Sequence, residues 1–292
     1  MPTLSVITPV YNGEKYLYRC YQNLLNQTFN DWEWVVVNDG STDGTVDEVK
    51  KISDPRLRLV TYPNNMGRGY ARSRALEECK GNWIVIWDVD DLHFPERLEQ
   101  INAVRKLGYD FFCSYAVVCT NDLKIKGIRG FSSTSHGLPK IFVHPTMACQ
   151  LDIAIKIGYD ATVRTGEDAE ILWMLPGNYS GFWCESALTI YQEDREINLQ
   201  KAIDSNMGHL RLLRKLFKNK SLQLTTTEYI YQCCKYSIKL TLMHLLKLKP
   251  DLYLKSVASR SYGEVYPRYC LTDKQLSYIN SIKTQFVHTD YT

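Results

Sequence analysis

The sequence predicts an α/β fold over its first 120 residues, in which a mostly parallel sheet is covered by helices on both faces. Short apolar runs alternate with segments whose apolar residues recur three or four positions apart. These are the periods of buried strands and of amphipathic helices. Strands separated by helices pair in parallel, and such sheets bury both faces under helices. Polar clusters also close four of the predicted strands in turn.

Five strands and four intervening helices are predicted in order along this part of the chain. Each strand is rich in β-branched or aromatic residues, and the five cover residues 4–10, 32–38, 57–62, 82–88 and 110–119. The helices are marked by apolar positions at 17, 20, 21, 24 and 25, then 46, 49 and 52, then 71, 75, 76 and 79, and finally 98, 101, 104 and 107. The regular alternation ends near residue 120.

The pattern changes in the rest of the chain. Gly, Ser, Thr and His accumulate between residues 121 and 145, and a helix is predicted over 167–175. After Asn198 the pattern is helical with little strand. We therefore expect a first domain over 1–198, with halves 1–120 and 121–198, followed by a helical C-terminal region over 199–292.

Composition excludes several classes of protein. The 292 residues carry a net charge of only +3, so nothing in the charge calls for a nucleic-acid partner. No signal peptide is recognised at the N-terminus, and no apolar run reaches the length of about 18 residues expected of a spanning helix. The nine cysteines follow no metal-ligand spacing. We expect buried, reduced thiols in a cytoplasmic protein.

The polar clusters predict a binding site at one edge of the sheet. They read PVYN, NDGSTD, PNNMGRG and DVDD, each at the end of a strand, and parallel sheets bind ligands beyond these ends. In DVDD, strand alternation puts Asp88 and Asp90 on the same side. Two close carboxylates favour a cation such as Mg²⁺ or Mn²⁺. The alternative is a solvated acidic turn ahead of the helix near Pro95.

Taken together, these segments resemble family 2 glycosyltransferases of the GT-A fold. PVYN, NDGSTDGT, NNMGRGYARSRAL, WDVDD and TGEDAEILWML occur in the family's order and approximate spacing, from about Leu4 to Leu175. The resemblance implies an inverting transfer of a sugar from a nucleoside diphosphate sugar with a divalent metal, Mn²⁺ or Mg²⁺. It makes 1–120 the donor-binding half and 121–198 the acceptor-binding half.

The resemblance also assigns the donor site. Asp39 would accept the ring N–H of the base, most simply uracil in a UDP-sugar, and Asp88 would contact ribose or sugar hydroxyls. Asp90 would hold the metal. Arg72, at the family's "AR" position, would add positive charge, whereas Arg68 and Arg74 are expected on a solvated basic helix face. The remaining donor contacts would come from Pro9, Tyr11, Asn12, Asn65 and Gly67. An alternative use of the second loop is a capping box formed by Thr45 and Glu48.

For the acceptor side, the resemblance points to Asp168 as general base, assisted by Glu167. Acidic residues also favour a helix's first turn for electrostatic reasons alone, and the helix dipole is expected to hold the pKa of Asp168 low. Asp91 and His144 are further candidates for contact with the acceptor. The late YRxH pattern of many relatives is absent, because the stretch reads YQED, and Glu193 or Asp194 is the only substitute in view.

The C-terminal third is basic. From Arg211 to Pro250, nine Lys or Arg residues stand against one acid, Glu228. A helix here would place Leu210, Leu213 and Phe217 on one face. That face would either lie on an anionic membrane through the segment 210–250 or pack on the catalytic domain. The expected location is the cytoplasm, with peripheral contact at the inner face of the membrane.

The predicted function is therefore transfer of a sugar to a hydroxyl of a glycan or lipid-linked acceptor, in the synthesis of a polysaccharide or glycoconjugate. A non-catalytic protein that binds sugar nucleotides is one alternative. A nucleotidyltransferase is another, although PVYNGEKY has only one Gly and one Lys where such enzymes carry a Gly-rich basic loop. A dinucleotide-dependent oxidoreductase is weaker, because GRGYAR lacks the third glycine.

Overall fold

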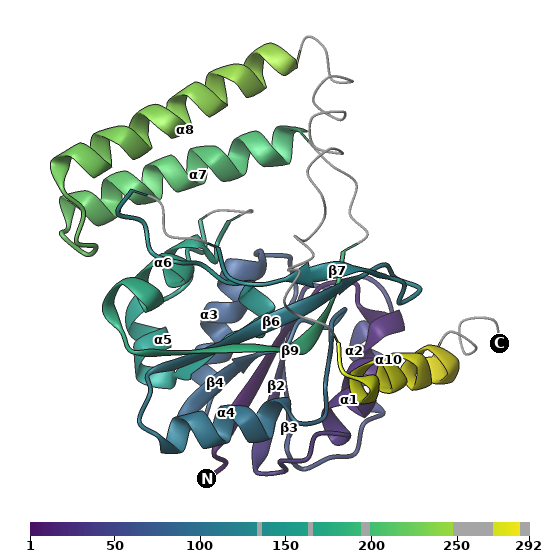
Figure 1. The fold of residues 1–292 in the computed structure, drawn as a ribbon. Coiled ribbons are helices and arrows are strands. Elements are labelled where there is room, and N and C mark those ends of the chain that lie inside the picture. Colours follow the sequence, from purple (N-terminus) through teal and green to yellow (C-terminus); the bar gives the residue numbers. More distant parts are fainter. Residues whose placement is uncertain (133–135, 163–165, 194–198, 248–270, 287–292) are drawn as a thin grey trace.

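The computed structural model describes residues 1–132, 136–162, 166–193, 199–247 and 271–286. Its centre is one sheet in the order β3-β2-β1-β4-β8-β6-β9-β5, with β7 paired to β6 (Figure 1). The strands are β1 Leu4–Val10, β2 Trp32–Asp39, β3 Leu57–Tyr62, β4 Trp83–Ile86, β5 Leu92–His93, β6 Phe111–Cys119, β7 Ile125–Arg129, β8 Ala148–Gln150 and β9 Gly181–Gln192.

The helices named in Figure 1 are α1 Glu14–Leu25, α2 Thr45–Lys50, α3 Arg68–Glu78, α4 Arg97–Lys106, α5 Leu151–Ile157, α6 Ala169–Asn178, α7 Leu199–Lys218, α8 Thr226–Leu246 and α10 Asp273–Phe286; a 3₁₀ turn covers His144–Thr146. None of these described helices combines the length and apolar character needed to cross a membrane.

The N-terminal half has the predicted parallel order. β1 pairs in parallel with β2 and β4, and β2 pairs in parallel with β3. Along β2, Trp34 and Val36 enter the core on one face and Val35 and Val37 the core on the other, so the strand is buried on both sides. α1, α2 and α4 cover the first face, and α3, α5 and α6 cover the second.

The second half of the sheet is mixed. β8 runs antiparallel to both β4 and β6, whereas the long strand β9 pairs in parallel with β6. β5, β7, β8 and β9 are not among the strands expected from the sequence. The register of β9 shifts beside Ser114 and Tyr115, and such an irregularity breaks the two-residue alternation on which strand prediction depends.

The C-terminal region divides into two parts. α7 and α8 form a hairpin that packs on α6 through Leu213, Leu216 and Trp173. α10 instead docks on the other side of the catalytic domain, where Ile279 and Ile282 join the core around β5 and β9 (Figure 1). The single helical region expected over 199–292 is therefore two separate attachments.

All eight described cysteines are free thiols, and four of them are buried. Cys234 is exposed, so the expectation of burial does not hold for every thiol.

Candidate active site

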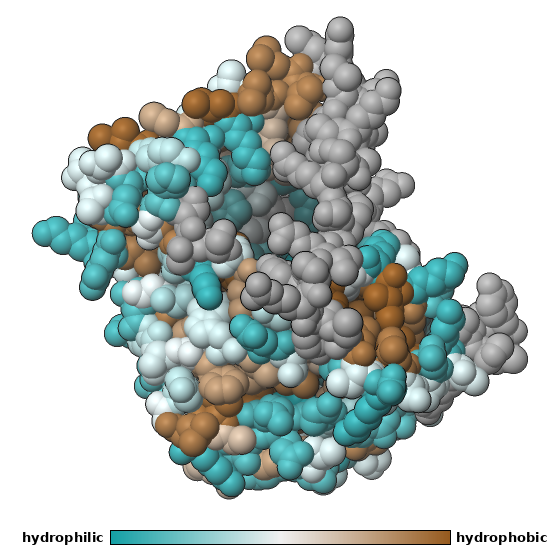
Figure 2. Space-filling view, in the orientation of Figure 1, coloured by the Kyte–Doolittle hydropathy of each residue, from teal (hydrophilic) through white to brown (hydrophobic). Residues whose placement is uncertain are grey.

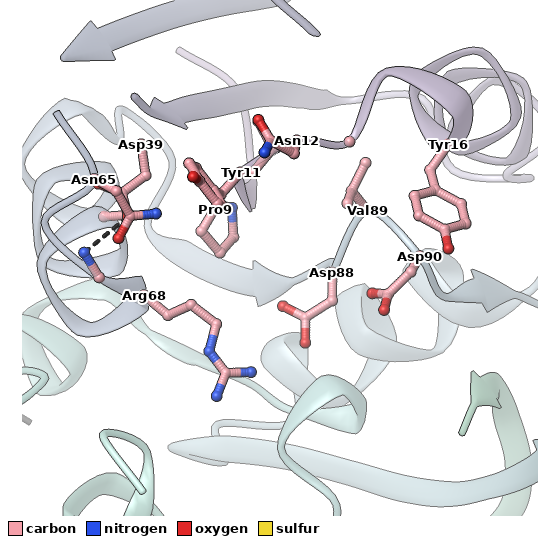
Figure 3. Close-up of a pocket in the computed structure, with 14 residues that line it drawn as sticks. Pro9, Tyr11, Asn12, Tyr16, Asp39, Asn65, Arg68, Asp88, Val89 and Asp90 are labelled. Carbon is pink, nitrogen blue, oxygen red and sulfur yellow. Dashed lines mark hydrogen bonds between the residues drawn. The ribbon is translucent and has the colours of Figure 1, made fainter. Parts of the chain in front are cut away.

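A cleft of about 370 Å³ lies at the carboxyl edge of the sheet, where β1 and β4 end (Figure 3). The strand order reverses between these two strands, because the chain passes from β1 outward to β3 and then returns to β4 on the other side of β1. Such a switch point opens a crevice between neighbouring loops. The cleft is lined by Pro9, Val10, Tyr11, Asn12, Gly13, Tyr16, Asp39, Asn65, Gly67, Arg68, Ala71, Asp88, Val89 and Asp90.

The first two loops are fastened to each other through Asn12. This residue has a positive φ of 53°, its N–H donates to Ser41 Oγ at 2.9 Å, and its Oδ1 accepts from the N–H of Thr42 at 2.8 Å. Asparagine tolerates this left-handed conformation better than most residues. Tyr11, just before it, is 49% exposed and stands on the cleft wall. The first loop thus presents an aromatic ring from a fixed backbone.

Asp39 connects the second loop to the third. Its Oδ1 accepts from Met66 N–H and its Oδ2 from Gly67 N–H, both at 2.8 Å. Gly40 follows with φ of 71°, and a Cβ there would lie 2.4 Å from the carbonyl carbon of Asn64. The two loops therefore approach so closely that only glycine fits. A carboxylate has about four lone-pair sites, so Asp39 keeps acceptor capacity toward the cleft it lines.

The capping box expected at Thr45 and Glu48 is wrong. α2 has Gly44 as its N-cap without a side-chain cap bond, and Thr45 Oγ1 instead accepts from Gly13 N–H at 2.9 Å. A capping box does occur at the start of α8, between Thr225 and Glu228. The second loop is organised by contacts with the first and third loops rather than by the helix that follows it.

A buried chain of charges joins the cleft to the start of α6. Arg72 donates from Nη1 to Glu167 Oε1 at 2.8 Å and from Nη2 to Asp88 Oδ1 at 3.1 Å. Arg68 Nε lies 3.2 Å from the same Glu167 oxygen. Arg72 and Glu167 are each only 2% exposed. The chain Arg68–Glu167–Arg72–Asp88 alternates in sign, so each buried charge has a partner.

This arrangement reverses the expected roles of two arginines. Arg72 is not among the residues that line the cleft, and its charge is matched by the two carboxylates that it contacts. Arg68, expected on a solvated face, lines the cleft and extends into it (Figure 3). Arg74 does lie at the surface, beside Glu77. Helical spacing alone would have separated Arg68 from Arg74, since six positions place them on different faces.

The two carboxylates at either end of this network respond to it differently. Burial alone would raise the pKa of Asp88, but the Arg72 guanidinium outweighs burial and holds the pKa below its usual value. For Asp168, the N-cap of α6, burial and the adjacent Glu167 raise the pKa above its usual value. The expectation that the helix dipole keeps the pKa of Asp168 low is therefore wrong.

Asp90 is the residue suited to a divalent metal. It is half-buried at the cleft wall, and its carboxylate lies near that of Asp88 (Figure 3). Asp88 is engaged with Arg72, and no group of three or more His, Cys, Asp or Glu in the described part of the chain could hold a metal by itself. The residues thus fit a hard cation that takes one or two carboxylates and completes its shell with water and phosphate oxygens.

Neither candidate for acceptor contact lines this cleft. Asp91 is 1% exposed, and its Oδ1 accepts from Gln192 N–H, which ties the end of β9 to the loop after β4. His144 is also buried, with Nε2 3.0 Å from the hydroxyl of Tyr159. Burial, with Arg72 nearby, holds the pKa of His144 well below its usual value, so the ring is neutral. Their positions favour supporting roles behind the site.

The stretch that replaces the late histidine pattern faces elsewhere. Glu193 pairs with Arg129 of β7 at 2.7 Å and is not among the cleft residues. Asp194, the other substitute considered, lies outside the described residues. Two cleft residues, Tyr16 and Val89, were missed from the sequence. Tyr16 belongs to the first turn of α1, and its position just after the first loop was the available signal.

Comparison with known proteins identifies this architecture. The profile described as Glycosyl transferase family 2 matches residues 5–162, more than half of the chain. The chain belongs to glycosyltransferase family 2. The uncharacterized glycosyltransferase MJ1057 of Methanocaldococcus jannaschii is 26% identical over 274 residues, 87% of this chain and 92% of that protein.

Another relative of this family 2 glycosyltransferase carries a defined activity in its name. It is the Escherichia coli UDP-Glc:alpha-D-GlcNAc-diphosphoundecaprenol beta-1,3-glucosyltransferase WfgD, 33% identical over 122 residues, 41% of this chain and 48% of that protein.

Solved structures confirm the GT-A fold. S. aureus TarS 1-349 in complex with UDP-GlcNAc superposes with a TM-score of 0.59 at 20% identity, covering 80% of this chain and 71% of that one. The Pyrobaculum calidifontis mannosyltransferase PcManGT, in complex with GDP-Man and Mn²⁺, gives a TM-score of 0.57 at 16% identity, with coverage of 98% and 85%.

Proposed function

We propose that this glycosyltransferase takes its sugar from a nucleoside diphosphate sugar, with a UDP-sugar as the first candidate, and transfers it with inversion to a hydroxyl of a glycan or lipid-linked acceptor. The observation that carries the proposal is the charge chain that links the cleft at the switch point to α6, at whose start Asp168 stands. TarS with bound UDP-GlcNAc and the UDP-Glc-dependent WfgD support the choice of donor.

In this proposal the donor's base lies between Tyr11 and Asp39. The hydroxyls of the donor face Asp88, whose ionised form is secured by Arg72. Asp90 holds the divalent metal, which when bound acts as a Lewis acid toward the diphosphate. Arg68 reaches the same region of the cleft and adds positive charge beside the leaving group.

Asp168 then accepts the proton of the acceptor hydroxyl as its oxygen attacks C1 of the sugar from the face opposite the diphosphate. The C1–O bond breaks with its electron pair retained by the diphosphate, and a single displacement inverts the configuration. A carboxylate with a raised pKa is the stronger base once ionised, which suits this transfer. Glu167 keeps its charge through two arginines and positions the start of α6. The synthesis of a polysaccharide or glycoconjugate is the proposed setting.

Nucleotide binding tests the proposal directly. We expect UDP, rather than GDP, dTDP, CMP or NAD, to raise the melting temperature, and Mn²⁺ to increase that rise. A ligand at a hundredfold excess over its Kd stabilises the folded state by about 2.7 kcal/mol. In Asp90→Asn the additional rise from Mn²⁺ should disappear while the effect of UDP alone persists.

Two outcomes would redirect the proposal. If no nucleoside diphosphate stabilises the protein, the cleft is not the donor site. If UDP-sugars bind but are neither hydrolysed nor transferred with Mn²⁺ present, the chain is the non-catalytic binder considered above.

A further inference from the structure

The outer face of α8 is apolar and exposed. We use this term for Ile230, Ile238, Leu242 and Leu245, which are 54%, 61%, 55% and 58% exposed. Spacings of eight, four and three residues put them on one side of the helix. Figure 2 shows the corresponding hydrophobic surface along the top of the molecule, over α8. Isolated apolar residues are common at surfaces, but a continuous patch marks a contact.

The opposite face of α8 already has its partner. Cys233 and Tyr236 pack toward Leu213 and Leu216 of α7, and Met243 packs with Ile203. The face expected from the sequence to meet a membrane, that of α7, is thereby used inside the protein: Leu213 is fully buried. The alternative that α7 packs on the catalytic domain is confirmed, and the unpartnered apolar surface belongs to α8 instead.

Charge decides which occupant suits the outer face. From residue 229 to residue 247 the sequence has three lysines, Lys235, Lys239 and Lys247, and no acidic residue. Lys235 is exposed one helical turn before Lys239. A second copy of the chain packed face to face would bring like charges together. An anionic lipid surface accepts both the apolar side chains and the lysines, at about 1 kcal/mol for each cation near the surface.

We propose that the outer face of α8 docks on a membrane containing anionic lipid, with its four apolar side chains in the interfacial layer. The hairpin of α7 and α8 lies beyond the carboxyl edge of the sheet, on the side of the molecule where the cleft opens (Figure 1). Docking would therefore hold the cleft toward the bilayer. If the proposed function is right, this orientation brings the site to a lipid-linked acceptor, but the docking itself does not depend on catalysis.

The test is co-sedimentation of the full chain with vesicles. We expect binding to phosphatidylcholine vesicles that contain about one third phosphatidylglycerol, and about tenfold weaker binding to pure phosphatidylcholine. The double variant Ile238→Gln/Leu242→Gln should lower binding about tenfold, since it removes apolar area from the interface. The matched control Leu107→Gln/Ile155→Gln changes two exposed apolar residues on α4–α5 surfaces, 71% and 55% exposed, and should bind as the unchanged protein does.

Further arms keep the outcomes separate. Lys235→Gln should weaken binding to the anionic vesicles, and high salt should do the same, because both reduce electrostatic attraction. The UDP-induced melting shift should be the same in the double variant and in the unchanged protein, so loss of docking is distinguishable from failure of the donor site. Equal sedimentation of the double variant and its control would overturn the proposal. So would a dimer in analytical ultracentrifugation that the double variant alone dissociates.

Discussion

At the scale of the residue, the site depends on carboxylates whose surroundings set their charge. Asp88 is held ionised by Arg72, Asp39 accepts two backbone N–H groups, and Asp168 is the carboxylate whose pKa is raised. Their chemical type is the same, so their different roles come from their neighbours. Predictions at this scale therefore concern protonation.

Replacing Asp168 by Asn removes the proposed base. We expect kcat to fall by about a hundredfold to ten-thousandfold, the usual contribution of a positioned base. The Kd for UDP, measured calorimetrically, should change little because Asp168 is not among the residues that line the cleft. A variant that keeps most of its kcat would assign the base elsewhere.

The acid limb of the pH–rate profile reports on the same group. Burial and Glu167 raise the pKa of Asp168, and Arg68 and Arg72 lower it in part. Activity should therefore rise with pH as Asp168 loses its proton, at a higher pH than for an ordinary aspartate. Arg68→Gln removes one of the opposing cations, so the acid limb should move to still higher pH. An unchanged or lowered limb would show that another group is being titrated.

At the scale of the element, the Arg68–Glu167–Arg72–Asp88 chain fastens three pieces of the fold. Arg72 is on α3, Asp88 follows β4, and Glu167 precedes α6. Gly69 permits the same approach, since a Cβ there would lie 2.4 Å from the carbonyl oxygen of Asp160. The network positions the donor side of the site relative to the acceptor side, so its removal should affect stability as well as rate.

Arg72→Met should cost about 3–5 kcal/mol of unfolding free energy, because it leaves two carboxylates of the network without their buried cation. Arg74→Met, on the same helix, is the matched control. Arg74 pairs with Glu77 at the surface, and such pairs contribute about 1 kcal/mol or less. Urea denaturation of both variants measures the difference. Equal losses would mean that the buried network adds nothing beyond a surface pair.

At the scale of the whole molecule, the catalytic domain is completed by the far end of the described chain. On α10, Gln275 Nε2 donates to the carbonyl of Ala187 at 2.8 Å, and Asn23 Nδ2 donates to the Tyr278 hydroxyl at 3.0 Å. Ile279 and Ile282 fill the core beside Leu92. α10 therefore covers the edge of the sheet formed by β5, which would otherwise expose its apolar surface.

Ile282→Ala should destabilise the protein by about 2–5 kcal/mol, as for other buried isoleucines, because Ile282 is 4% exposed. Leu276→Ala, on the same helix but 38% exposed, should cost much less. Thermal denaturation distinguishes the two, and UDP should still shift the melting temperature of both variants. If the two substitutions cost the same, α10 is not part of the cooperative core.

The sequence by itself determined β1 to β4 and β6, the helices between them, the four loops at the carboxyl edge and the family. These features follow from local periodicity and from short motifs, which act over a few residues. Most of the cleft could therefore be named in advance, from Pro9 to Asp90. The raised pKa of Asp168 and the cleft position of Arg68 could not be, because each depends on residues about a hundred positions away.

Only the tertiary structure decided which apolar and charged faces are used internally. Leu213 of α7 is buried while Ile238 of α8 is exposed, although both belong to apolar stripes in the sequence. β9 reads irregularly because its partner β6 shifts register, and α10 crosses to the opposite side of the domain to cover β5. Pairing across long sequence separations has no local signal, since it is selected by the shape and charge of the completed core.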